Sequence, residues 1–491
     1  MMPEGTDMYR HLRTSVIAGV SLSLALAAAI SPVAAAPQPD ERSSHQRFEA
    51  EEARLSKGMA AALRSAGFDQ LVDFDNRIDG VAQPAAFLPN IDLAVIELDS
   101  SGHVIGAANI LYDRDNPRGY VVDIDRKSLR AMGVEFSRWS PERFADPASW
   151  AAGPAAEDIL VQPTKVRKEY MLTYPASVLK LMVGYSILRL VDQGRLRLNT
   201  EIVYHEEDGK TCQYPPSNPE EVQPPPQADG ATDTVTGWLD QMITVSDNFA
   251  TCVLLQAIYD TGALEEANAH FKALGLSTLV MQPQNPAVGA GWQTGHFSMG
   301  SLDTARLLLL VAGASGRLWQ APGNRAITAS SGLSAGSRRY FEGVLAQQSF
   351  NEVLNPVNLC GSTDAVQGIP STVSKRWIDP KTGNVVTYDG DVVIDFGYNV
   401  RPCVSRAEVK FAHKTGLVSF AGSDAGIVRA LPGQDGRMYV VSIQSSVGYR
   451  YGDPDWATSD PNACLGSPYV CYSRAFGRVG LAVDNLVKAR S

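Results

Sequence analysis

The order of β-rich and helical segments along the chain constrains its fold more than any other sequence feature. Two β-rich runs at residues 91–98 and 103–112 flank a glycine-containing turn, which predicts a hairpin. Helical patterns dominate residues 177–312, and strand-like runs precede a final helix at about residues 475–488. The strand-like runs are residues 392–396, 407–413, 426–430 and 438–442. An early hairpin can join late strands in one antiparallel sheet. We therefore predict an α+β fold, with a helical lobe and a site in the cleft between lobe and sheet.

The N-terminus has the pattern of a secretory signal. Basic residues Arg10 and Arg13 precede an apolar run at residues 16–30, and small residues follow it up to Ala36. The apolar run is shorter than the ~20 residues that span a bilayer, which disfavours the alternative of a transmembrane anchor. We expect residues 1–35 to be a cleaved signal peptide. The mature protein is then expected to be secreted or periplasmic in a bacterium, without stable membrane insertion.

Charge and cysteine content narrow the possible partners. The formal net charge of -10 argues against a nucleic-acid partner, which would need a basic face. The six cysteines are an even number, which permits disulfides in an exported chain. Of the possible pairings we favour Cys464–Cys471 and Cys360–Cys403, whereas Cys252 in an apolar helical run is compatible with a buried thiol. No cysteine and histidine spacing suits zinc, so we predict no metal and no cofactor.

Ser177 and Lys180 form the first candidate catalytic pair. Ser177 stands where a helix should begin, and Lys180 follows on the same face one turn later. The helix is apolar around nearly its whole circumference, which predicts that it is buried. Burial disfavours the ammonium form of lysine, and a neutral amine can accept the proton of a serine hydroxyl. The alternative is a capping serine beside a lysine that reaches solvent.

Two tripeptides further along the chain support this pair. Ser-Asp-Asn at 246–248 lies between two apolar helical runs, and Lys-Thr-Gly at 414–416 follows the strand-like run 407–413. Taken singly, each tripeptide is also compatible with a helix cap or a turn. A second Lys-Thr-Gly at 381–383 follows Asp379-Pro380 and is typical of a hairpin tip. We prefer the copy at 414–416 because it lies on an apolar strand.

Ser-x-x-Lys, Ser-Asp-Asn and Lys-Thr-Gly in this order resemble the signature of class A β-lactamases and related penicillin-binding proteins. Further similar text lies at residues 188–196, 242–255 and 297–305, and the resemblance covers about residues 90–112 and 168–491. It implies a β-lactamase-like fold in which helices flank an antiparallel sheet. The domains we predict are an N-terminal tether and helix at 36–89, a catalytic domain at 90–491 with its helical lobe at about 170–330, and insertions at about 113–168, 213–233 and 350–406.

The resemblance implies a role for each motif residue in catalysis. Ser177 would attack an amide or β-lactam carbonyl and form an acyl-enzyme. Lys180 would accept the proton of Ser177, alone or through a water molecule. Ser246 would pass a proton to the leaving nitrogen. The oxyanion hole would consist of the backbone N–H groups of Ser177 and Leu417.

The remaining motif residues would bind the substrate. Asn248 would hold the side-chain amide of the substrate and the side chain of Lys180. Lys414 would attract the substrate carboxylate by charge, and Thr415 would bind it through its hydroxyl. Gly416 completes the Lys-Thr-Gly motif, directly before Leu417.

One position departs from the resemblance. Class A β-lactamases use a glutamate next to a proline to activate the water that releases the acyl group, and Gln282 holds that place here, before Pro283. An amide cannot take up a proton at neutral pH. We therefore expect deacylation to be slow or to use another base. The family's usual disulfide is also missing, because Gly184 stands where its first cysteine would lie.

These residues predict an exported serine hydrolase of the class A β-lactamase type. Its expected substrate is a β-lactam or a peptidoglycan stem peptide. One alternative is a D-alanyl-D-alanine peptidase that deacylates β-lactams slowly. Another is a non-catalytic protein that binds cell-wall peptides or β-lactams. Esterase-like relatives usually carry Tyr-x-Asn, which this chain lacks at 246–248. We expect a monomer.

Overall fold

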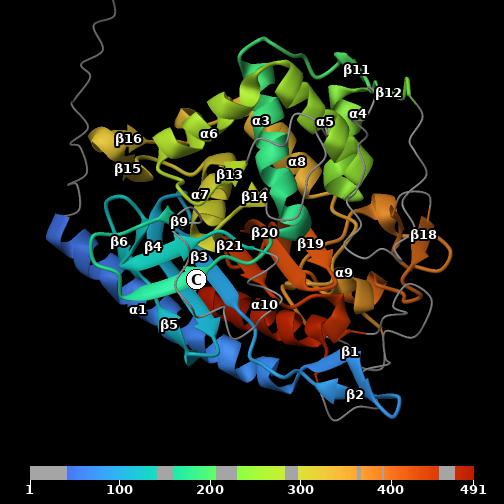
Figure 1. The fold of residues 1–491 in the computed structure, drawn as a ribbon, viewed down its shortest axis with the longest axis horizontal. Coiled ribbons are helices and arrows are strands. Elements are labelled where there is room, and N and C mark those ends of the chain that lie inside the picture. The colour runs from blue at the N-terminus through green and yellow to red at the C-terminus, as the bar shows by residue number, and fades with distance from the viewer. Residues whose placement is uncertain are drawn as a thin grey trace, which may run out of the picture. The chain divides into compact units, whose positions relative to one another are not determined.

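The computed structural model describes residues 41–140, 159–205, 229–281, 297–361, 367–389, 392–452 and 470–490 (Figure 1). Residues 45–491 form one compact unit. Its longer helices are α1 (Glu41–Ser65), α3 (Lys180–Asp192), α4 (Val235–Thr244), α5 (Asn248–Asp260), α6 (Ala263–Leu274), α7 (Ser301–Val311), α8 (Ala335–Leu345) and α10 (Tyr472–Lys488). A single-turn helix, α9, covers Arg401–Val404.

A six-stranded antiparallel sheet organises this unit. Its strands lie in the order β19 (Val409–Val418), β20 (Ala421–Ala430), β21 (Met438–Ser445), β3 (Ile91–Leu98), β4 (Val104–Asp113) and β5 (Asn116–Val121). Strand β21 pairs with β3, so strands from opposite ends of the sequence meet at the middle of the sheet. The predicted junction of the early hairpin with the late strands is confirmed, as is the α+β fold with a helical lobe.

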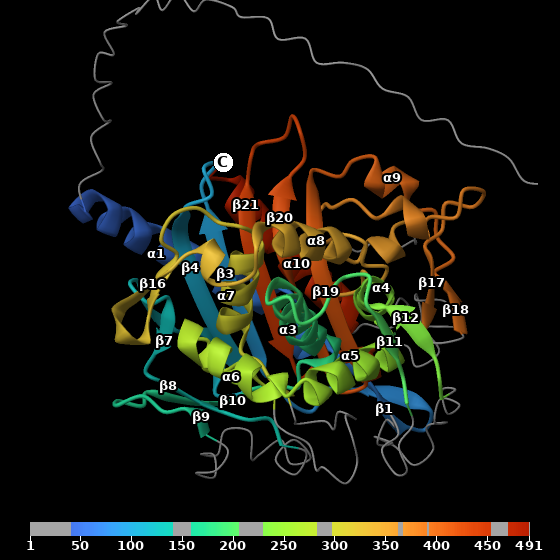
Figure 2. The same ribbon diagram turned by 90° about the horizontal axis from the view of Figure 1, so that it is seen from above.

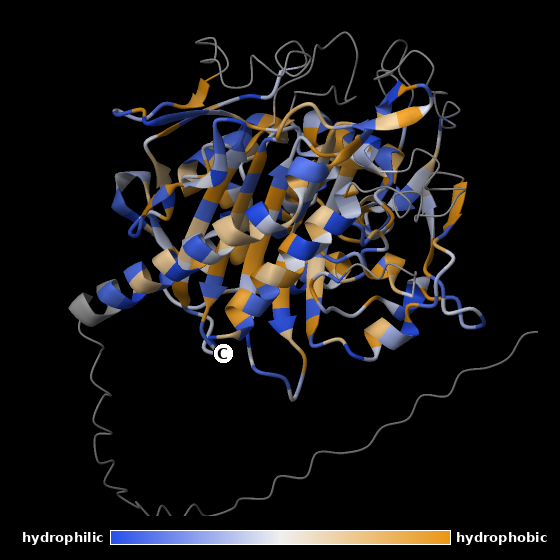
Figure 3. Ribbon diagram, turned by 90° about the horizontal axis from the view of Figure 1, so that it is seen from below, coloured by the Kyte–Doolittle hydropathy of each residue, from blue (hydrophilic) through white to orange (hydrophobic). Residues whose placement is uncertain are grey.

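Both faces of the sheet are covered, and β3 shows why. All of its residues are buried, and alternate side chains enter different cores. Leu93 and Val95 pack with α1 and α10, whereas Ala94 and Ile96 pack with the helices of the opposite face. Figure 2 shows α3, α6, α7 and α8 over one face, and Figure 3 shows the opposite face crossed by α1 and α10.

Helix α3 is the buried centre of the helical lobe. It packs against α4, α5 and α8, and its residues from Lys180 to Leu188 are all buried. Gly184 lets α8 approach, because a Cβ atom there would lie 3.0 Å from the ring of Phe341. The prediction of a helix that is apolar around its circumference is confirmed. The small side chain at 184 thus serves close helix packing.

The remaining strands form small sheets around the main one. These strands are β1 (Val72–Ile78) with β2 (Val81–Pro84), β6 (Asp123–Asp125) with β7 (Arg130–Met132), β8 (Val134–Ser137) with β9 (Ile159–Val161) and β10 (Lys168–Met171), β11 (Glu201–Val203) with β12 (Thr232–Thr234), β13 (Val280–Met281) with β14 (Phe297–Ser298), β15 (Trp319–Ala321) with β16 (Arg325–Ile327), and β17 (Val386–Asp389) with β18 (Val392–Asp395). The predicted strand at 392–396 therefore belongs to a separate hairpin and not to the main sheet.

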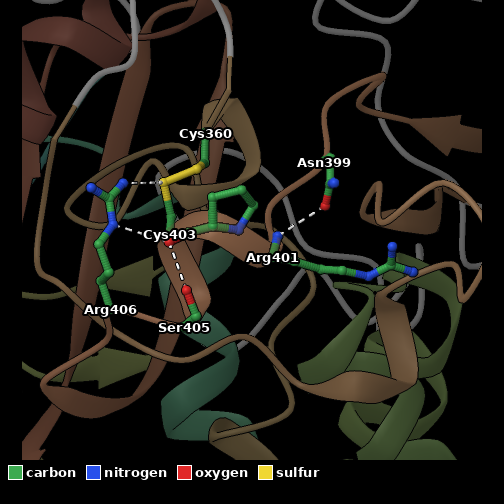
Figure 4. Close-up of a disulfide and its surroundings, with 7 residues drawn as sticks. Cys360, Asn399, Arg401, Cys403, Ser405 and Arg406 are labelled. Carbon is green, nitrogen blue, oxygen red and sulfur yellow. Dashed lines mark hydrogen bonds between the residues drawn. A yellow bond between two sulfur atoms is a disulfide. The ribbon is translucent and has the colours of Figure 1, made fainter.

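The predicted disulfide Cys360–Cys403 is present and closes the segment that carries this hairpin (Figure 4). Its loop spans 43 residues. The interpretation of Cys252 as a buried thiol is wrong, because Cys252 is disulfide-bonded, as is Cys471. Periodicity identified the buried helical position but carried no signal for the bond. The other half of the predicted pair with Cys471, Cys464, lies outside the described residues.

Candidate active site

The three motifs meet where the edge strand β19 adjoins the helical lobe. Ser177 lies in a short 3-10 helix, Ala176–Leu179, that directly precedes α3. The predicted start of an α-helix at Ser177 is thus displaced by one turn, and Lys180 becomes the first residue of α3. Ser246 lies in the loop between α4 and α5, and Asn248 begins α5.

Gly416 permits strand β19 to run directly beside the nucleophile. A Cβ atom at Gly416 would lie 2.7 Å from the backbone nitrogens of both Ser177 and Val178, and 2.8 Å from the carbonyl oxygen of Pro175. Real Cβ atoms essentially never approach backbone atoms so closely. The backbone at Gly416 therefore lies beside the backbone nitrogen of Ser177. The predicted oxyanion hole would pair this nitrogen with that of the next residue, Leu417.

Lys180 joins the first two motifs beneath the surface. Its side chain is 0% exposed. Its Nζ lies 3.1 Å from Ser177 Oγ, 2.9 Å from Ser246 Oγ and 2.8 Å from Asn248 Oδ1, and it also donates to the carbonyl of Ser246. The alternative of a lysine that reaches solvent is wrong. An amine held between two serine hydroxyls is placed to take a proton from one and give it to the other.

Lys414 approaches the same hydroxyl from strand β19. Its Nζ lies 3.0 Å from Ser246 Oγ and 2.6 Å from the carbonyl oxygen of Thr415. Burial lowers the pKa of Lys414 well below its ordinary value, and the charge of Lys180 lowers it further. The charges of Asp424 and Glu352 oppose this shift. Two buried ammonium groups around one hydroxyl repel each other. The arrangement therefore favours a neutral amine at one of the two lysines.

Backbone strain is concentrated at two of the motif segments. Ala176, directly before the nucleophile, has φ 46°, and Ser246 has φ 60°. Each left-handed non-glycine residue costs about 1–3 kcal/mol and persists only where its surroundings hold it. The Asp247 carboxylate accepts from the backbone N–H of Ala250 at 2.5 Å and caps α5, which fixes the loop that carries Ser246.

The hydroxyl of Thr415 is engaged away from Ser246. Thr415 Oγ1 donates to the carbonyl oxygen of Phe350 at 2.9 Å and lies 3.5 Å from Nδ1 of His413. Donation to a substrate carboxylate therefore requires the O–H bond to turn toward the substrate, while Oγ1 keeps its position. The side chain itself is almost fully buried.

The second Lys-Thr-Gly is a turn, as predicted. The carboxylate of Asp379 accepts the backbone N–H groups of Lys381 and Thr382, both at 2.7 Å, and Gly383 has φ 82°. This copy precedes β17 and takes no part in the hydrogen bonds of the Ser177 site that are described above.

Comparison with known families identifies the chain. A model of the Beta-lactamase enzyme family matches residues 165–455, more than half of the sequence. The chain belongs to the β-lactamase enzyme family. The matched range contains all three motifs of the site.

Solved structures of β-lactamase type are among the similar chains. PBP-A is 19% identical over 64% of this chain and 81% of its own, with a TM-score of 0.38. A β-lactamase from Chitinophaga pinensis is 16% identical over 65% of this chain and 86% of its own, with a TM-score of 0.37. A class A β-lactamase of the last common ancestor of Gram-negative bacteria is 15% identical over 89% of this chain and 99% of its own, with a TM-score of 0.38. No curated protein sequence matches.

Gln282, the position expected to affect deacylation, lies outside the residues that the structure describes. Within the described ranges, no group of three histidine, cysteine or acidic side chains is arranged to hold a metal ion. Among the helices that the structure describes, none combines the length and the apolar character needed to cross a membrane.

Sequence reasoning missed a polar layer behind the Lys-Thr-Gly strand. The segment after α8 contributes Phe350, Asn351 and Glu352, and these residues lie near His413 and Asp424. The only available signal was the histidine directly before Lys414. These three residues begin the predicted insertion at about 350–406, and two of them contact β19 beside Lys414.

Glu352 gives this layer a measurable pH dependence. Burial raises the pKa of Glu352 from 4.5 to about 8. The folded state thus keeps a proton that the unfolded state loses, and folded stability should fall between about pH 4.5 and 8, by at most about 1.4 kcal/mol per pH unit. Glu352→Gln should remove this contribution. Urea unfolding at pH 5, 6, 7 and 8 measures it, with the exposed Glu265→Gln as control. An unchanged slope in Glu352→Gln would contradict the prediction.

Gly416→Ala tests the close approach of β19 to the nucleophile. The added Cβ must push backbone against backbone, and a displacement of about 1 Å can cost on the order of 100-fold in rate. We expect acylation to slow by about that factor while the protein stays folded. The control is Gly343→Ala on α8, where an added Cβ meets nothing within 4 Å. If Gly416→Ala reacted with a fluorescent penicillin at the wild-type rate, the close approach would not matter for acylation.

Proposed function

We propose that this chain is an exported serine hydrolase that forms an acyl-enzyme at Ser177 with a β-lactam or a related cell-wall amide. The observation that carries the proposal is the position of Lys180 Nζ within hydrogen-bond distance of both Ser177 Oγ and Ser246 Oγ. Membership of the β-lactamase enzyme family supports the same reaction class. The lysines are buried while Ser177 and Ser246 remain partly exposed, which suits a reaction with a ligand from solvent.

The proposed acylation forms a bond from Ser177 Oγ to the carbonyl carbon and breaks the carbon–nitrogen bond. Ser177 Oγ bonds to the carbonyl carbon as its proton passes to the neutral amine of Lys180. Backbone N–H groups of Ser177 and Leu417 stabilise the oxyanion. When the carbon–nitrogen bond breaks, Ser246 gives its proton to the leaving nitrogen and regains one from Lys180. Lys414 offers positive charge for the substrate carboxylate.

Intact-mass analysis of the purified protein with benzylpenicillin tests this proposal. We expect the mass to rise by one penicilloyl group, and tryptic peptides should map the adduct to Ser177. An adduct on another residue would overturn the assignment of the nucleophile. Unmodified protein together with unmodified penicillin would overturn the proposed reaction.

We propose further that release of the acyl group from β-lactams is slow, because Gln282 cannot act as a base. A chromogenic cephalosporin should then give one burst of product equal to the enzyme concentration, followed by a stable adduct. Sustained fast turnover would contradict slow release and favour an efficient β-lactamase. Release of D-alanine from a stem peptide ending in D-alanyl-D-alanine would favour the peptidase alternative.

Export and assembly are also proposals. A signal peptide at residues 1–35 predicts a mature N-terminus at Ala36, which N-terminal sequencing of the exported protein can check. We propose that the mature protein is a monomer, a state that light scattering measures. A non-catalytic binding role would be favoured if Ser177→Ala bound ligands as the wild type does and no activity were lost.

A further inference from the structure

His413, the residue before the Lys-Thr-Gly motif, is enclosed in the polar layer behind β19. Its side chain is 2% exposed, and that of Asp424 on β20 is 0% exposed. His413 Nδ1 lies 2.8 Å from Asp424 Oδ1, and Nε2 lies 3.1 Å from Asn351 Oδ1. The ring stacks on Phe411, with centroids 4.1 Å apart and an interplanar angle of 8°. Each ring nitrogen therefore faces an oxygen atom.

The amide orientation of Asn351 is fixed by its other contacts. Asn351 Nδ2 donates to the carbonyl oxygens of Gln348 and Ser349, and Oδ1 accepts from Asn355 Nδ2 at 3.0 Å. A flipped amide would set its oxygen against two carbonyls. The atom that faces His413 is therefore an acceptor, and Nε2 must carry a hydrogen to bond it.

Both carboxyl oxygens of Asp424 face hydrogen-bonding groups. Asp424 Oδ2 accepts the backbone N–H of Leu354 at 3.2 Å, while Oδ1 faces His413. A neutral imidazole has one nitrogen without hydrogen and would present a lone pair to one of its two oxygen partners. An imidazolium donates to both oxygens and pairs with the buried carboxylate.

The same layer holds Thr415. In the β19–β20 register Thr415 is paired with Asp424, and His413 lies two residues away on the same face of β19. Phe350, which accepts the hydroxyl of Thr415, directly precedes Asn351, which accepts from His413. One segment after α8 thus contacts both residues that flank Lys414.

We propose that His413 is a buried imidazolium and a positioning residue, which fixes Thr415 and so the edge of β19 that receives the substrate carboxylate. His413 does not itself contact substrate in this scheme. The functional part of the inference rests on the proposed acylation at Ser177, whereas the charge state and the position of Thr415 do not.

Nitrogen NMR tests the charge state without any substrate. The chain has 7 histidines, and the signals lost in His413→Asn identify those of His413 in protein labelled with ¹⁵N-histidine. At pH 7 we expect both ring nitrogens of His413 to be protonated in the wild type, and one to lose its proton in Asp424→Asn. A neutral His413 in the wild type would overturn the proposal.

A crystal structure of His413→Asn tests the positioning. We expect the Thr415 hydroxyl to leave the carbonyl of Phe350 while Ser177 and Lys180 keep their contact. An unchanged Thr415 would overturn the positioning role. The control is His270→Asn, which removes a partly buried histidine bonded to Tyr185 in the helical lobe and should leave Thr415 in place.

Acylation kinetics test the consequence for substrate binding. For His413→Asn we expect the half-saturating penicillin concentration to rise about tenfold, with the limiting acylation rate changed less than about twofold, because ground-state binding is affected. Thr415→Val should act similarly, and the double variant should add little, since both changes remove one interaction. Additive effects, or an equal effect of His270→Asn, would contradict action through Thr415. A wild type that forms no acyl-enzyme refutes the proposed function instead, while NMR and crystallography still decide the inference.

Discussion

Ser177→Ala should form no covalent adduct with penicillin. The substitution removes the only atom that the proposed reaction uses to attack the carbonyl, and loss of a nucleophile typically costs about 10⁶-fold in rate. Ser177 makes few contacts of its own, chiefly the 3.1 Å contact with Lys180 Nζ, so the fold should persist. Intact mass after overnight incubation with benzylpenicillin measures the loss, and thermal unfolding verifies the fold.

The same variant separates binding from chemistry. Lys414 and Asn248 remain in place in Ser177→Ala, so we expect noncovalent binding of penicillin to survive, as calorimetry can show. Ser331→Ala serves as a matched control, because this serine lies in a short helix outside the three motifs and should acylate like the wild type. A persistent adduct in Ser177→Ala would assign the reaction to another nucleophile.

Lys180→Met should slow acylation by about 10²–10⁴-fold, the usual contribution of a positioned general base. Methionine is also unbranched and fits a buried helical position, but it has no amine to accept the proton of Ser177. The contacts of Nζ with Ser246 Oγ and Asn248 Oδ1 vanish as well. Ser177 then keeps its proton, and nucleophilic attack depends on water alone.

Lys168→Met is the control for this change. Lys168 pairs with Asp113 at 2.6 Å on a small sheet and makes no contact with the motif residues that the structure describes. It should acylate at the wild-type rate. If Lys180→Met also acylated at that rate, another group would have to take the proton, and Lys414 through Ser246 Oγ would be the first candidate.

Much of the site could be predicted from the sequence, because residues three or four positions apart on a helix lie close together in space. The separation of three positions from Ser177 to Lys180 amounts to nearly one helical turn, and the apolar surroundings of Lys180 predict its burial. The order of strands and helices predicted the junction of β3 with β21. The apolar run before Lys414 also distinguished this lysine, on a strand, from Lys381, which follows Asp379-Pro380 in a turn.

The tertiary structure alone decided what depends on contacts between distant segments. No local pattern indicates that Lys414 and Lys180 share one hydroxyl, that Gly416 must lack a Cβ beside Ser177, or that Cys252 is disulfide-bonded. The residues that surround His413 come from β20 and from the segment after α8. Burial in this layer raises the pKa of Glu352 to about 8, because the energy of a buried charge depends on the groups packed around it and not on its neighbours in sequence.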